Sequence, residues 1–188
     1  MNTDPLIMSA RQALRAELRA KRRALSEQEQ CHAQQQLLTQ ASDFIHNADI
    51  IAAYLPNDGE ISPQALIDYA WAHNKTVALP VLHPFHPQTL LFVRYTSQSN
   101  MTKNKFGIPE PQLTTQDIIP IHNINRIFVP LVGFDDQGNR MGMGGGFYDR
   151  TLAPITQSHQ VGYVSFKIST PPTLIGLATG LQSSSRKR

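Results

Sequence analysis

The stretch "RIFVPLVGF" (126–134) runs through a short polar turn into "NRMGMGGGFYDR" (139–150), and this junction is the most informative part of the sequence for the fold. The first part is a short apolar run, which predicts a buried strand that leads into the glycines. In the second part, four of the five positions 142–146 are glycine. The segment "FYDRTLAPI" (147–155) then begins a helix. A strand, a glycine loop and a helix start in this order can aim backbone N–H groups at a bound anion.

The rest of the chain alternates between strand and helix patterns. Further strands are predicted at 49–56, 76–82, 90–95 and 160–166, whereas 97–125 has a loop-like composition. Such alternation predicts an α/β fold, a three-layer sandwich whose mostly parallel central sheet is flanked by helices. We expect one domain over residues 1–188.

Polar residues mark the expected helix starts. Ser9 with Gln12, and Ser26 with Glu29, match the capping-box spacing, and the second helix is expected to run to about Asn47. A third helix is predicted to begin at Pro63, with Ser62 as its N-cap. The first helix is rich in basic residues.

Composition restricts the class of protein. No apolar run approaches the ~18 residues that span a bilayer, and no secretory signal is evident at the N-terminus. Cys31 is the only cysteine, which fits a reducing compartment. We therefore expect a cytoplasmic protein with no membrane partner, and a monomer.

Basic residues are concentrated near the N-terminus. Six of the 17 basic residues lie between Arg11 and Arg23, and no Asp or Glu follows Asp149. This distribution favours an anionic partner such as nucleotide phosphate, although a solvated helix face explains the same pattern. Near the glycines, Arg140 and Arg150 could contact phosphate oxygens and Asp149 could hold Mg²⁺. A glycine-rich turn with Asp149 as a surface acid is the alternative.

Four motifs resemble one family in the right order. "VPLVGFDDQGNRMGMGGGFYDR" (129–150) is similar to the signature of the 5-formyltetrahydrofolate cyclo-ligase family. "RQALRAELRAKRRAL" (11–25), "YLPNDGEISPQALI" (54–67) and "NKFGIPEP" (104–111) resemble its basic helix and two further segments. The likeness covers about 9–163, and 164–188 form a divergent tail.

The resemblance implies ATP-dependent, Mg²⁺-dependent cyclisation of 5-formyltetrahydrofolate to 5,10-methenyltetrahydrofolate through a phosphorylated formyl group. It implies nucleotide binding by a set drawn from the first helix and the glycine loop: Arg11, Arg15, Arg140, Met141, Gly142, Met143, Gly144, Gly145, Gly146, Phe147 and Tyr148. It implies a metal contact at Asp149.

The substrate contacts implied by the resemblance come from two segments: Leu55, Glu60, Met143, Gly144, Gly145, Gly146 and Phe147. Glu60, Arg140 and Tyr148 are the expected catalytic residues. A carboxylate can accept the N–H groups of a pterin, and we hypothesise that Glu60 also takes the N10 proton. Otherwise Glu60 is a turn residue beside Gly59, and Tyr148 either stacks on a ring or packs in the core.

The C-terminal sequence departs from the family pattern. Residues after Tyr163 include no carboxylate, so the family's second metal-contacting acid has no counterpart and the last strand is in doubt. Divergence, an altered C-terminus or impaired metal binding would each explain this. We expect weaker Mg²⁺ dependence or lower activity than the family norm.

Two rival functions stay open. One is an inactive relative, and the other is a module that binds nucleotide or nucleic acid through its basic residues. Aromatic residues are only 7% of the chain and do not alternate with the basic ones, as single-strand binding would require. Small-molecule partners, with no nucleic acid, are therefore expected.

Overall fold

The protein is built around a mixed sheet. The computed structural model describes residues 4–135, 139–156 and 173–177. Their helices and strands, with two 3₁₀ turns (η1 and η2), are α1 (Pro5–Arg23), α2 (Glu27–His46), β1 (Ile50–Ala52), α3 (Gln64–Ala72), β2 (Thr76–Leu82), β3 (Leu90–Tyr95), β4 (Met101–Lys103), β5 (Pro109–Pro111), η1 (Thr115–Asp117), β6 (Ile118–Ile119), η2 (Ile121–Asn123), β7 (Arg126–Pro130), β8 (Gly133–Phe134), β9 (Arg140–Met141), α4 (Phe147–Thr156) and β10 (Thr173–Leu177).

The main sheet has the strand order β10-β7-β1-β2-β3-β6. β10, β7, β1 and β2 pair in parallel, whereas β3 runs antiparallel to both of its neighbours, β2 and β6. The predicted α/β class with a mostly parallel sheet is therefore confirmed. β10 pairs with β7 over five residues, so the strand that the C-terminal sequence put in doubt is present. The predicted strand at 160–166 lies outside the described residues.

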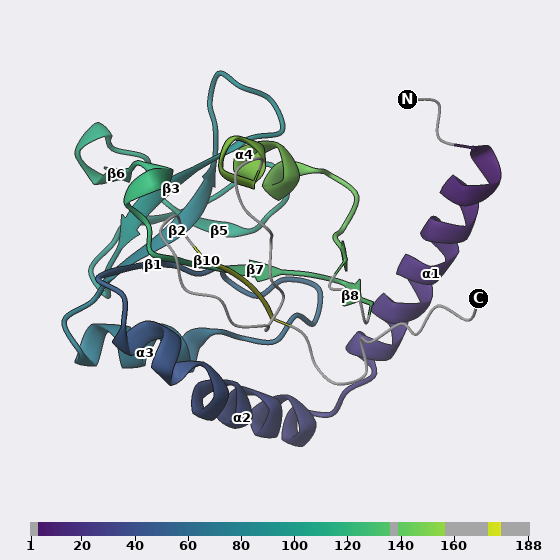
Figure 1. Cartoon of the computed structure of the whole chain (residues 1–188), viewed down its shortest axis with the longest axis horizontal. Coiled ribbons are helices and arrows are strands. Elements are labelled where there is room, and N and C mark those ends of the chain that lie inside the picture. The colour runs from purple at the N-terminus through teal and green to yellow at the C-terminus, as the bar shows by residue number, and fades with distance from the viewer. Residues whose placement is uncertain (1–3, 136–138, 157–172, 178–188) are drawn as a thin grey trace.

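Helices cover both faces of this sheet, as Figure 1 shows with α2 and α3 below it and α4 above it. One core cluster joins α2 and α3 to the sheet through Ile45, Leu66 and Phe128. The other joins α4 to the opposite face through Leu152 and Ile127. These side chains are almost fully buried, so each helix is held by apolar contact.

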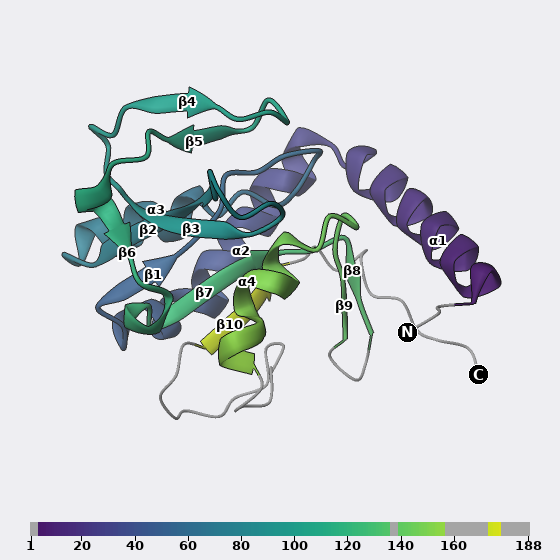
Figure 2. The same ribbon diagram turned by 90° about the horizontal axis from the view of Figure 1, so that it is seen from above.

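The topology creates a crevice between β1 and β7. The chain leaves β1 for α3 on one face and leaves β7 for α4 on the other, although the two strands are neighbours. Ligands of open α/β sheets bind at the carboxyl ends of strands where the connections diverge in this way. Figure 2 shows the β8–β9 hairpin and α1 beyond that end of the sheet.

The helix starts agree with the prediction in part. α2 has the predicted capping box, with Ser26 and Glu29 bonded reciprocally. The capping box at Ser9 and Gln12 is wrong, because α1 already begins at Pro5 with Asp4 as its N-cap. For α3 the start is one residue later than predicted, and Pro63 is the N-cap.

The segment predicted as a loop, 97–125, contains the hairpin β4–β5 and the short strand β6. Asn104 organises the hairpin turn, because its Oδ1 accepts the N–H groups of Phe106 at 2.9 Å and Ile108 at 3.2 Å. None of the described helices is long and apolar enough to cross a membrane.

Candidate active site at the carboxyl ends of β1 and β7

A cavity of about 500 Å³ lies at the carboxyl ends of β1 and β7, where the topology predicts a ligand site. Its walls come from α1, the segment after β1, the hairpin β4–β5 and the glycine loop. Every residue predicted as catalytic, nucleotide-binding, substrate-binding or metal-binding lines it: Arg11, Arg15, Leu55, Glu60, Arg140, Met141, Gly142, Met143, Gly144, Gly145, Gly146, Phe147, Tyr148 and Asp149. Their individual roles stay predictions.

The glycine loop does not follow β7 directly, as the sequence suggested, because the hairpin β8–β9 lies between them. Gly144 and Gly146 have φ of +99° and +68°, values that side chains disfavour. A Cβ at Gly146 would also lie 2.7 Å from the guanidinium of Arg150. α4 begins at Phe147, so the positive end of its dipole lies at the cavity.

Arg150 holds this loop from outside the cavity. Its Nη2 donates to the carbonyl of Gly145, and its Nε donates to the carbonyl of Gln88 at 3.0 Å. Arg150 does not line the cavity. The suggested contact of Arg150 with phosphate is therefore not supported, and the residue instead ties the glycine loop to the loop after β2.

Arg140 and Asp149 form an ion pair across the glycine loop. The Asp149 side chain is 73% exposed, whereas that of Arg140 is 14% exposed. No group of three His, Cys, Asp or Glu side chains suited to a metal occurs among the described residues. The single carboxylate of Asp149 beside the glycine loop suits Mg²⁺ that binds together with nucleotide phosphates, because Mg²⁺ commonly takes few protein ligands.

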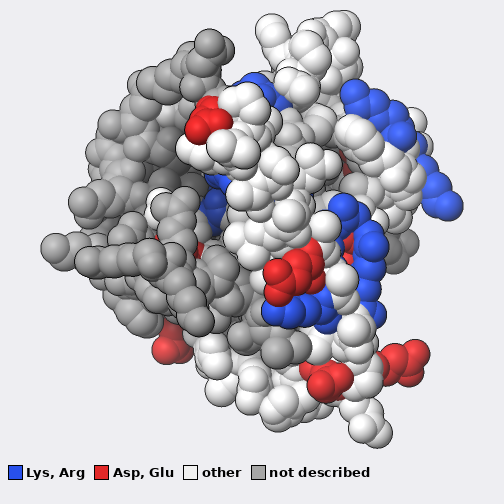
Figure 3. Space-filling model, turned by 90° about the vertical axis from the view of Figure 1, so that its right-hand side faces the viewer, with Lys and Arg blue, Asp and Glu red and all other residues white. Residues whose placement is uncertain are grey.

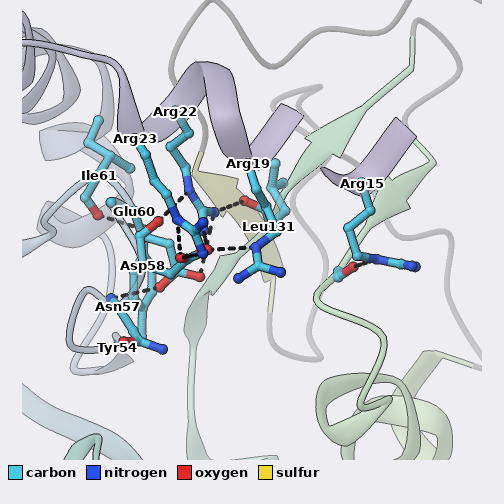
Figure 4. A network of polar contacts seen from close by, with 12 residues as sticks. Arg15, Arg19, Arg22, Arg23, Tyr54, Asn57, Asp58, Glu60, Ile61 and Leu131 are labelled. Atoms are coloured by element: carbon cyan, nitrogen blue, oxygen red, sulfur yellow. Dashed lines mark hydrogen bonds and ion pairs between the residues drawn. The ribbon is translucent and has the colours of Figure 1, made fainter. Parts of the chain in front are cut away.

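α1 reaches the cavity with its basic side chains. The Nε of Arg15 donates to the carbonyl of Gly142 at 2.8 Å, which joins the first helix to the glycine loop (Figure 4). Arg11 lines the same cavity one turn earlier. Figure 3 shows Lys and Arg side chains gathered on the face where α1 lies, with acidic side chains beside them.

Asp58 anchors the other end of α1. Its carboxylate accepts hydrogen bonds from Arg19 and Arg22 at 2.7 Å each, and it also pairs with Arg23 (Figure 4). The hydrogen bond from Arg19 is the main cause that lowers the pKa of Asp58 to about 2. The alternative of a solvated basic face is therefore wrong for Arg22, which is buried, whereas Arg19 and Arg23 pair with Asp58 while their side chains stay partly exposed.

Glu60 lies two residues after Asp58 and is largely buried. Its Oε2 accepts the N–H of Asn57 at 3.1 Å, and its Oε1 is 3.8 Å from Nη1 of Arg22. Burial raises the pKa of Glu60 to about 6, while the Asn57 hydrogen bond and the charge of Arg22 oppose the rise. A carboxylate with this pKa can accept a proton near neutral pH.

Two tyrosines line the same cavity as this carboxylate. The Oη of Tyr148 is buried and has no hydrogen-bond partner among the described residues. Burial raises the pKa of Tyr148, and the charge of Glu60 adds to the rise. The ring of Tyr148 packs against the core cluster of α4, so the packing alternative holds for the ring while the hydroxyl stays unpaired. Tyr54 is satisfied, because its Oη donates to the carbonyl of Ile61 at 2.8 Å.

Sequence reasoning missed several lining residues. Asn104, Phe106 and Glu110 come from the hairpin β4–β5, and Tyr54 and Asn57 precede the Asp58 turn. The ring of Phe106 meets that of Phe147 edge to face, with centroids 5.7 Å apart. The "NKFGIPEP" motif was the signal for the hairpin residues. Tyr54, Asn57 and Asp58 lie within the "YLPNDGEISPQALI" motif, which did not indicate the pairing of Asp58 with α1.

Fold and site together define an α/β enzyme class in which a glycine loop, cationic side chains and a buried carboxylate surround one cavity. The family model described as the 5-formyltetrahydrofolate cyclo-ligase family matches residues 7–182. The chain belongs to this family, whose members are ATP-dependent ligases.

Named relatives are similar over most of the chain. A 5-formyltetrahydrofolate cyclo-ligase of Haemophilus influenzae is 49% identical over 144 residues, which are 76% of this chain and 77% of that protein. The Escherichia coli K12 protein of the same name is 43% identical over 137 residues, 72% and 75% of the two chains. The Aquifex aeolicus 5,10-methenyltetrahydrofolate synthetase structure has a TM-score of 0.73 at 24% identity, covering 95% of this chain and 82% of that chain. That last likeness shows the fold.

Proposed function

We propose that this protein converts 5-formyltetrahydrofolate to 5,10-methenyltetrahydrofolate with ATP, through a phosphorylated formyl group, and releases ADP and phosphate. One observation carries the proposal: every residue expected to bind nucleotide or folate lines the same cavity. Family membership supports the overall conversion. The phosphorylated intermediate, the order of steps and the role of each residue are part of the proposal.

The first step is phosphoryl transfer, which requires positioning and neutralisation of charge. The formyl oxygen attacks the γ-phosphorus, and the bond from that phosphorus to the bridging oxygen of ADP breaks. The cavity offers the glycine loop, the start of α4 and three guanidinium groups, those of Arg11, Arg15 and Arg140, around one space. Because Arg15 donates its hydrogen bond to the neutral backbone carbonyl of Gly142, a charged phosphate oxygen can replace that carbonyl as the acceptor.

The second step closes the ring. N10 attacks the activated formyl carbon, the carbon–oxygen bond breaks, and phosphate leaves with that oxygen. N10 loses its proton, and we assign Glu60 as the carboxylate that accepts it. Its pKa of about 6 leaves the base ionised at neutral pH yet able to bind a proton.

Other residues orient the reactants. The unpaired Oη of Tyr148 stays protonated and can donate a hydrogen bond to the substrate. Leu55, Met143 and Phe147 supply apolar surface to the cavity that can hold the pterin. Asp149 would hold Mg²⁺ together with the nucleotide phosphates, and the ion would neutralise charge there.

The test is a direct assay of turnover. The protein is incubated with 5-formyltetrahydrofolate and Mg-ATP, and the ultraviolet absorbance of the methenyl product is followed. Many turnovers per protein, with no product when ATP is omitted, support the proposal. Binding of both ligands without product would identify an inactive relative, and salt-sensitive RNA binding with neither ligand retained would identify a nucleic-acid module.

A further inference from the structure

Glu110 in β5 is a buried carboxylate that the proposed steps do not use. Its residue is 9% exposed and it lines the cavity. Arg22 is the other buried charged residue in the described ranges, and Arg22 is paired with Asp58. In those same ranges no ion pair involves Glu110. A buried charge without an opposite charge is costly unless its hydrogen-bonding capacity is filled.

The two oxygens of Glu110 are used unequally. Oε2 accepts the N–H of Leu82 at 3.3 Å and the Nδ2 of Asn104 at 3.0 Å. Oε1 accepts no hydrogen bond from any residue that the structure describes. Oε2 therefore fixes the position of the carboxylate, and Oε1 can accept a hydrogen bond from a ligand.

The hairpin turn preorganises this arrangement. Asn104 Oδ1 is occupied by the N–H groups of Phe106 and Ile108, so the amide orientation is set and its Nδ2 is directed to Glu110. Gly107 has a φ of +76°, which lets the turn close. β5 also packs near the end of β2, where Leu82 supplies the second donor. The carboxylate is held before any ligand arrives.

We propose that Oε1 of Glu110 accepts a hydrogen bond from the 2-amino group of the reduced pterin, which makes Glu110 a specificity-determining residue. This inference rests on the proposed function. The 2-amino group is a strong donor at the edge of a flat ring, and a carboxylate oxygen is its natural acceptor. Apolar side chains line the same cavity and suit the ring itself: Leu79, Leu82, Leu90 and Ile108. Glu60 is then left for the N10 proton.

The variant Glu110→Gln isolates this one oxygen. Its amide oxygen can replace Oε2 and keep both existing hydrogen bonds, while its NH₂ group replaces Oε1 with a donor. The measurement is kcat/KM for 5-formyltetrahydrofolate and for its 2-desamino analogue. Wild type should prefer the natural substrate by about 10- to 100-fold, the range for a hydrogen bond to a charged group. Glu110→Gln should prefer it by less than about 3-fold.

The ratio of kcat/KM for the two substrates distinguishes a direct contact of Glu110 with the 2-amino group from a purely structural role of Glu110. A purely structural role of Glu110 would lower both rates together and keep the preference, which overturns the inference. Glu60→Gln is the matched control from the same cavity and should keep the wild-type preference. Loss of preference in Glu60→Gln but not in Glu110→Gln would place the 2-amino group at Glu60 and also overturn it.

Binding to wild type gives a second arm that depends on neither variant nor turnover. Calorimetric titration should show the natural folate binding about 10- to 100-fold more tightly than the desamino analogue. Equal affinities overturn the inference even where Glu110→Gln fails to fold. Absence of turnover with this binding difference intact refutes the proposed function and leaves the Glu110 contact standing.

Discussion

The carboxylate of Asp58 accepts a hydrogen bond from Nη2 of Arg22 at 2.7 Å, and Arg22 is only 1% exposed. The backbone carbonyl of Asp58 also accepts from Nε of Arg22 at 2.9 Å. Arg22 belongs to the helix that carries Arg11 and Arg15, whereas Asp58 belongs to the turn that carries Glu60. This pair therefore links the residues expected at the phosphates to the residue expected at N10.

We expect Asp58→Asn to loosen α1 from this turn. Because it removes the carboxylate bonded to the buried Arg22 guanidinium and leaves Glu60, 3.8 Å away, as the remaining opposite charge, the free energy of unfolding should fall by about 2–4 kcal/mol. KM for ATP should rise about 10-fold more than KM for folate, since the displaced helix carries the nucleotide contacts. Chemical denaturation and steady-state kinetics measure the two effects.

Glu17→Gln is the control for that variant. It removes the Glu17–Lys21 pair on the same helix, whose side chains are both more than half exposed. Exposed pairs contribute about 0.5 kcal/mol or less, so stability and KM for ATP should hardly change. If Asp58→Asn behaves like Glu17→Gln, Asp58 does not anchor the helix.

The pH profile should show the titration of Glu60. Burial raises its pKa to about 6 from the ordinary 4.5, so the ionised base is lost as the pH falls through 6. We expect log kcat/KM to decline below about pH 6 with unit slope. Glu60→Gln should remove this limb and reduce kcat about 100-fold or more, the range for general-base catalysis. Near-normal turnover of the variant rules out the base role.

Arg150→Ala should weaken nucleotide binding from outside the cavity. The variant releases the carbonyls of Gly145 and Gln88, so the glycine loop loses its preorganisation. We expect KM for ATP to rise about 10-fold with a smaller change for folate. Arg94→Ala is the control, because Arg94 is exposed on β3 and, among the described residues, its side chain makes one hydrogen bond, to Thr76, which is long at 3.4 Å. Equal kinetics of the two variants would contradict the role of Arg150.

Asp149→Asn should change the magnesium requirement. Asp149 is the last acidic side chain in the sequence, and its carboxylate lines the cavity. The concentration of Mg²⁺ for half-maximal activity should rise about 10-fold, because charge at the site is reduced. A Mg²⁺ titration at saturating ATP measures this. An unchanged midpoint would show that Asp149 does not contact the ion.

Local patterns predicted much of the fold. The apolar runs at 76–82 and 90–95 coincide with β2 and β3, and the Ser26–Glu29 capping box marks the start of α2. These features depend on residues close in sequence. Ser9 failed as a cap because the stronger start at Asp4 and Pro5 comes before it.

Long-range features were not predictable in the same way. Arg22 and Asp58 are 36 residues apart, so local sequence favours the Asp58–Gly59 turn, with φ of +57° and +76°, but does not predict its pairing with Arg22. Glu110 was visible in a motif, but its burial depends on the end of β2 and on the Asn104 turn. The site residues could be listed from the family resemblance, whereas the contacts that hold them required the structure.

The proposed chemistry is tested most directly by the fate of the formyl oxygen. 5-Formyltetrahydrofolate labelled with ¹⁸O in the formyl group is converted with unlabelled ATP, and the inorganic phosphate is examined by mass spectrometry. A phosphorylated formyl intermediate requires one ¹⁸O atom in each phosphate released. Phosphate without the label, with ¹⁸O appearing in water, would contradict phosphoryl transfer to the formyl group at this cavity.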